Sequence, residues 1–79
     1  MAFYILILKI HESTNKVIYA FGPNEQQMGK LEINKKNGYF KILKPVEIQN
    51  SQAFFKRAAM KLSQHWKNNE FPQRTTWES

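Results

Sequence analysis

The chain has 79 residues, 42% of them hydrophobic and 14% aromatic, and its formal net charge is +6. A chain of this length holds one small hydrophobic core, and its composition is typical of a folded domain, not of a disordered segment. The lack of cysteine excludes disulfides, thiolate metal sites and cysteine nucleophiles. We therefore expect a single small domain over residues 1–79.

The N-terminal run MAFYILILKI has the features of neither a signal peptide nor a transmembrane helix. It lacks a basic start and a small-residue cleavage site, and it is far shorter than the roughly 20 residues that cross a bilayer. Residues 3–12 are dense in β-branched and aromatic side chains, which predicts a buried strand. We expect a cytoplasmic protein without membrane insertion.

A second strand is predicted over residues 16–22, and Thr14-Asn15 supplies the turn of a first hairpin. A two-residue turn pairs Ile10 with Tyr19, although a register one residue away also fits the pattern. The preferred register places five large apolar side chains on one face, namely Leu6, Leu8, Ile10, Tyr19 and Phe21.

The segment INKKNGYFKILK, residues 33–44, predicts a second hairpin. Asn37-Gly38 is the preferred dipeptide of a two-residue type I′ turn, because both central positions need a positive φ. This turn sets Ile33 opposite Ile42. The register directs four apolar side chains of this hairpin to the core, namely Leu31, Ile33, Phe40 and Ile42.

Pro45 ends the fourth strand, and Asn50 or Ser51 can cap a helix over residues 52–68. The helix has one apolar side, formed by Phe54, Phe55, Ala58, Ala59, Leu62 and Trp66. Residues 70–79 follow as a flexible or docking tail. The fold class predicted is α+β: a four-stranded antiparallel β-meander (β-β-β-β-α) with one C-terminal amphipathic helix packed on one face.

Groups that carry chemistry are scarce. The chain contains no aspartate, and its glutamates and two histidines show no spacing typical of acid–base catalysis or metal binding. Its three glycines stand apart, so no phosphate-binding loop is indicated. We expect no enzyme activity, no catalytic residue, no metal site, no cofactor and no small-molecule ligand.

One helix covers only one side of the predicted sheet, so apolar residues on the other side need another cover. The deduced registers place there Phe3, Ile5, Ile7, Ile18, Ala20, Tyr39 and Leu43. We therefore expect a non-catalytic binding domain that acts through protein contacts, with a protein partner or as a homodimer. The alternative is that the tail folds back, with Phe71 and Trp77 over these residues.

The positive charge offers a second hypothesis, which is nucleic-acid binding. A basic hairpin can enter a groove, and lysines on the outer side of a helix can contact phosphates. The candidate contacts are Lys30, Lys35, Lys36, Lys41, Lys44, Lys56, Arg57, Lys61 and Lys67. The alternative is that these side chains are solvated and that lysines protect sheet edges from aggregation.

Overall fold

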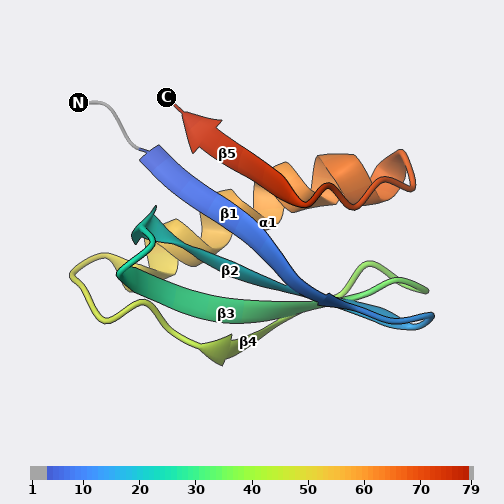
Figure 1. Cartoon of the computed structure of the whole chain (residues 1–79), viewed down its shortest axis with the longest axis horizontal. Helices are drawn as coiled ribbons and strands as arrows, with labels where there is room; N and C mark the ends of the chain where they lie inside the picture. Colours follow the sequence, from blue (N-terminus) through green and yellow to red (C-terminus); the bar gives the residue numbers. More distant parts are fainter. Residues whose placement is uncertain (1–3, 79) are drawn as a thin grey trace.

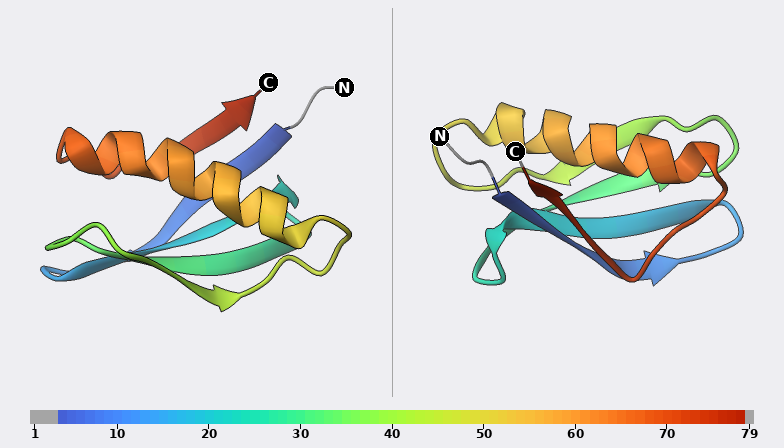
Figure 2. Two further views of the ribbon diagram at one scale, coloured as in Figure 1. Left: turned by 180° about the vertical axis from the view of Figure 1, so that it is seen from behind. Right: turned by 90° about the horizontal axis from the view of Figure 1, so that it is seen from above.

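One antiparallel sheet forms the frame of the protein (Figure 1). The computed structural model describes residues 4–78. In chain order the elements are β1 (Tyr4–Glu12), β2 (Lys16–Asn24), β3 (Gln27–Asn34), β4 (Phe40–Lys44), α1 (Ser51–Lys67) and β5 (Arg74–Glu78). The five strands follow the order β4-β3-β2-β1-β5, and α1 lies across one face of the twisted sheet (Figure 2).

The predicted α+β class and the antiparallel meander of β1 to β4 are confirmed, but the predicted C-terminal position of the helix is wrong. Residues 74–78 form a fifth strand that pairs antiparallel with β1, with Trp77 opposite Ile5. Without this strand, β1 would expose a row of unpaired N–H and C=O groups. Thr75, Thr76 and Trp77 are residue types that favour strands, so this part of the tail completes the sheet.

A β-bulge in β1 decides which of its side chains enter the core. Near the turn, Glu12 lies opposite Val17 as the two-residue turn predicts, but the register shifts by one between Lys9 and His11. An extra residue in one strand reverses the alternation of faces beyond it. Ile7 therefore lies opposite Phe21, and the prediction that Leu6 and Leu8 share a face with Phe21 is wrong.

The second hairpin is shifted by two residues from its predicted register. Ile33 lies opposite Phe40 and not opposite Ile42. The hairpin closes through a longer loop. Trp66 packs against Gly38 in this loop, where a Cβ would come within 3.0 Å of the indole ring. The Trp66 Nε1–H also donates a hydrogen bond of 2.8 Å to the Lys35 carbonyl oxygen. A shift of two preserves the faces, so Phe40 still packs against the core as predicted.

The core lies between α1 and the sheet. Ala58 and Leu62 of α1 are buried there, as the apolar side of the predicted helix requires. The Phe21 and Phe55 rings lie 6.1 Å apart between centroids in a tilted arrangement. The remaining buried members are Ile5, Ile7, Val17, Tyr19, Phe21, Leu31, Ile33 and Val46.

Asn residues border the helix at both ends. Asn50 occupies the N-cap position with a φ of 64°, but its side chain makes no capping hydrogen bond. Asn69, two residues after the helix, has a φ of 57°, which is the left-handed conformation in which helices commonly end. No helix within residues 4–78 combines the length and the hydrophobicity needed to cross a membrane.

Candidate functional site

The sheet face opposite α1 carries a strip of aliphatic side chains. Side chains alternate along a strand, and directly paired residues share a face. Leu8 is paired with Ala20, and both point away from the side occupied by Ile7 and Phe21. We call this surface the open face and define its apolar strip as Tyr4, Leu6, Leu8, Ile18, Ala20 and Leu43.

Burial within the open face is uneven. Leu6 and Ala20 are only 5% and 8% exposed, yet neither belongs to the core cluster under α1. Tyr4 and Leu43, at the two ends of the strip, are each 43% exposed. Leu8 and Ile18 are half-buried between them. The side chains at the centre of the strip are thus buried, whereas those at its two ends are exposed to solvent.

Three lysines border this strip over β3 and β4. Lys30 lies opposite Ala20, Lys41 lies opposite Glu32, and Lys44 lies opposite Lys30. All three lysines are exposed. Of their neighbours on the same face, Glu32 is already 3.6 Å from the Lys16 ammonium group. The open face therefore combines an aliphatic strip with a positive border.

The residues predicted for a protein interface separate into three groups. Ile5 and Ile7 are fully buried in the core under α1, so their predicted position on the uncovered face is wrong. Ile18 and Leu43 lie on the open face, and Tyr39 is 74% exposed in the β3–β4 loop. Phe3 lies outside the described residues. Leu6 and Leu8 were missed because the bulge that turns them outward has no local sequence signal.

The residues predicted to bind nucleic acid do not form one surface. Lys30, Lys41 and Lys44 lie on the open face, whereas Lys35 and Lys36 lie in the β3–β4 loop. The helical group lies across the sheet from the first, since α1 covers the opposite face. That group consists of Lys56, Arg57, Lys61 and Lys67.

Glu12, in the first hairpin, forms an ion pair with Lys35 in the loop of the second hairpin. Its carboxylate accepts hydrogen bonds from Lys35 Nζ at 2.7 Å and from Lys9 Nζ at 2.5 Å. Lys9 Nζ also donates to the Phe71 carbonyl oxygen at 2.9 Å, and the Lys35 ammonium group lies 5.1 Å from the centre of the Phe71 ring. Lys35 is therefore engaged in holding the fold and is a poor candidate for a free phosphate contact.

The same contacts change the acidity of Glu12. Hydrogen bonds from Lys35 and then Lys9 lower the pKa of the Glu12 carboxyl group from 4.5 to about 2. Nearby, the Tyr19 hydroxyl donates a hydrogen bond of 2.7 Å to the Pro72 carbonyl oxygen. Burial, followed by the charge of Glu12, raises the pKa of Tyr19 above its usual range.

Replacing Glu12 by glutamine is expected to remove a pH-dependent part of the stability. Because the pKa is lower in the folded protein, the contribution is complete above pH 4.5 and is lost as the pH falls toward about 2. The difference in free energy of unfolding between wild type and Glu12→Gln, measured with urea, should therefore narrow as the pH falls from 4.5 toward about 2. Glu25→Gln, in the exposed turn before β3, is the control. A gap that stays constant with pH contradicts the assignment.

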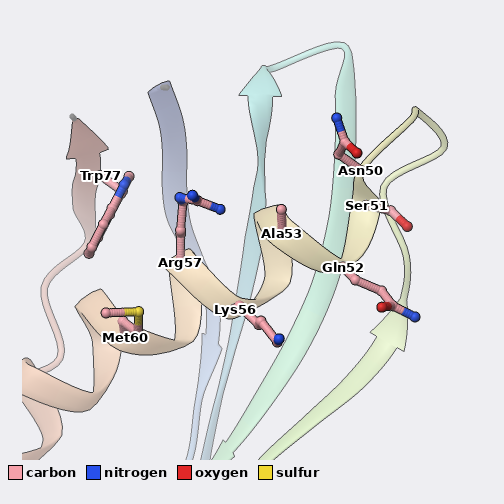
Figure 3. A pocket seen from close by; sticks show the side chains of 8 residues that line it. All are labelled: Asn50, Ser51, Gln52, Ala53, Lys56, Arg57, Met60 and Trp77. Atoms are coloured by element: carbon pink, nitrogen blue, oxygen red, sulfur yellow. The ribbon is translucent and has the colours of Figure 1, made fainter. Parts of the chain in front are cut away.

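A depression of about 850 Å³ lies between the first turns of α1 and the end of β5 (Figure 3). Ala53, Met60 and Trp77 give it apolar walls, and Lys56 and Arg57 give it positive charge. The described residues that line it include no carboxylate. The Trp77 Nε1 atom is buried and has no hydrogen-bond partner. The depression suits a ligand group that is both anionic and partly apolar.

Among the described residues, no group of three or more His, Asp or Glu side chains could hold a metal ion. No protein-family model matches the chain, and no curated protein or solved structure matches it. Two surfaces of the described chain therefore stand out, namely the open face and the depression beside Trp77.

Proposed function

We propose that the chain is a small non-catalytic binding domain that binds an acidic protein partner through the open face. The observation that carries this proposal is an aliphatic strip on the sheet face that α1 leaves uncovered, with Lys30, Lys41 and Lys44 along its border. Protein interfaces commonly combine an apolar centre with a polar rim. A partner surface with an apolar centre and an acidic rim complements this arrangement.

The charge pattern favours a different protein over a second copy. Two open faces brought together would add one lysine border to another, in a chain whose net charge is already +6. Within residues 4–78, the carboxylates on this face are Glu32, which neighbours Lys16, and Glu78 at the far edge. Like charges that face each other across an interface are unfavourable. We therefore place homodimerisation second.

The strip itself argues against a platform for nucleic-acid bases. Sheet surfaces that bind single strands usually stack the bases on aromatic side chains. Here the centre is aliphatic, with Leu6, Leu8 and Ile18, and Tyr4 lies at one end. The lysine border attracts any polyanion, so nucleic acid is kept as an outcome of the test.

Site-specific cross-linking in the cells that make the protein tests the proposal. A benzophenone amino acid replaces Ile18 on the open face in one variant and Gln64, which is exposed on α1, in a matched control. The position-18 variant is expected to cross-link to an acidic protein that the position-64 variant does not capture. Equal capture from both positions contradicts the proposal, as does cross-linking only to nucleic acid or to a second copy.

A second substitution separates apolar contact from charge. Leu8→Arg interrupts the strip but adds positive charge, so it should weaken binding of the captured protein about tenfold or more if the strip is the contact. Binding driven by charge alone would instead be unchanged or strengthened. Far-ultraviolet circular dichroism checks that this variant keeps its fold.

A further inference from the structure

The outer edge of β5 is available for another strand. β5 pairs with β1 on one side and ends the sheet on the other in the described chain. The Lys9 N–H donates to the Gln73 carbonyl oxygen at 2.8 Å. Because antiparallel ladders alternate, Thr75 and Trp77 then bond to β1. The N–H and C=O groups of Thr76 and its second neighbours along β5 point outward.

The two edges of the sheet differ in protection. At the opposite edge, β4 carries Lys41 and Lys44 and is followed by Pro45, and such residues discourage pairing with another strand. β5 reads Arg-Thr-Thr-Trp-Glu and has neither lysine nor proline. Its central residues favour extended structure. The β5 edge is therefore the better acceptor of an added strand.

The depression described above lies beside this edge. Trp77 comes from β5 and Met60 from α1, and Figure 3 shows both at the same side of the helix. Lys56 lies on the same wall, one helical turn before Met60. α1 contains no acidic residue along its whole length. A side chain that enters from the β5 edge meets apolar surface and positive charge together.

We propose that an extended acidic segment of a partner protein adds to β5 as a sixth strand and directs alternate side chains into this depression. Strand addition draws its affinity from main-chain hydrogen bonds and its specificity from pockets for alternate side chains. The positive wall selects carboxylates, and the surface of Trp77 and Met60 accepts the methylene groups of the same acidic side chains. This site shares no residue with the apolar strip of the open face and goes beyond the function proposed for it.

Titration with short synthetic peptides tests the proposal on the full-length protein. The probe is a capped peptide that alternates glutamate with valine, and its control carries lysine for glutamate. Binding is followed by tryptophan fluorescence and by amide hydrogen exchange. The glutamate peptide should bind at least about tenfold more tightly than the lysine peptide. It should protect the Thr76 amide while leaving the amides of Thr75 and Trp77 almost unchanged, because those already face β1.

Two backbone probes distinguish strand addition from simple charge attraction. One peptide is N-methylated on every valine and the other on every glutamate. Because alternate residues of a strand direct their N–H groups to opposite edges, each peptide has the N–H groups of one edge blocked. Strand addition requires that one of these peptides binds and the other does not. In the protein, Thr76→Pro removes the outward N–H and should weaken binding about tenfold.

Charge variants complete the test. Lys56→Glu should weaken binding about tenfold, whereas Lys67→Glu, at the far end of α1, should have a much smaller effect. Leu8→Arg should leave peptide binding unchanged, which separates this site from the open face. Equal binding of both N-methylated peptides, unaltered binding by Lys56→Glu, or protection at β4 in place of β5 would each overturn the proposal.

Discussion

Replacing Ile7 by alanine is expected to lower the free energy of unfolding by about 2–5 kcal/mol, while the same change at the adjacent Leu8 should cost about 1 kcal/mol or less. Ile7 is fully buried in the core that includes Leu62. Leu8 is half-buried on the open face. The large difference arises because only the change at Ile7 leaves a cavity between the sheet and α1.

Urea unfolding followed by circular dichroism measures both variants under the same conditions. A domain of this size has a total stability of only several kcal/mol, so Ile7→Ala should be partly unfolded even without denaturant. Ile7→Val is the milder control, with an expected loss of about 1 kcal/mol. Equal losses for the alanine variants at positions 7 and 8 would contradict the bulge between Lys9 and His11 and the faces that it assigns.

The second large effect concerns β5. Thr75→Pro is expected to lower the free energy of unfolding by about 2–3 kcal/mol, because it removes the N–H that faces β1 and leaves the Ile7 carbonyl group without its donor. Thr76→Pro should cost less than about 1 kcal/mol, since proline is tolerated where the N–H points away from the sheet. The same substitution at two adjacent threonines is thus expected to cost clearly different amounts of stability.

Thermal unfolding of both proline variants, with Thr75→Ala as the control for the lost side chain, measures this difference. The control matters because Thr75 Oγ1 lies 3.5 Å from His65 Nε2. Hydrogen exchange gives a second readout: the Ile7 amide should lose protection in Thr75→Pro and keep it in Thr76→Pro. Comparable destabilisation by both prolines would contradict the register between β1 and β5.

The residues of the uncovered sheet face were predicted only in part from the sequence. Ile18 was correctly expected on the uncovered face, because its pairing with His11 keeps the predicted register. Leu43 was also expected there, and it keeps this face because a shift of two residues preserves the alternation of faces. Ile5 and Ile7 were misplaced because one bulged residue reverses everything on its N-terminal side. The depression beside Trp77 was not predicted, because it depends on a strand and a helix that lie far apart along the chain.

The elements themselves follow from local chemistry. Dense β-branched and aromatic residues predicted β1, an apolar period of 3.6 residues predicted α1 over Ser51–Lys67 to within a residue, and Asn69 supplied the left-handed residue behind it. Each of these signals depends on neighbours a few residues away. That is why the strand meander, the helix and its buried side could be read from the chain alone.

Tertiary contacts decided the rest. The loop between β3 and β4 is longer than the predicted two-residue Asn37-Gly38 turn, and the Trp66 ring packs against Gly38 within it. Residues 74–78, predicted as a tail, pair with the edge of β1 that would otherwise be unpaired and so form β5. The bulge in β1 chose Ile5 and Ile7 for the core and left Leu6 and Leu8 for the open face. In each case the free energy comes from burial and hydrogen bonding between segments distant in sequence, which no local pattern encodes.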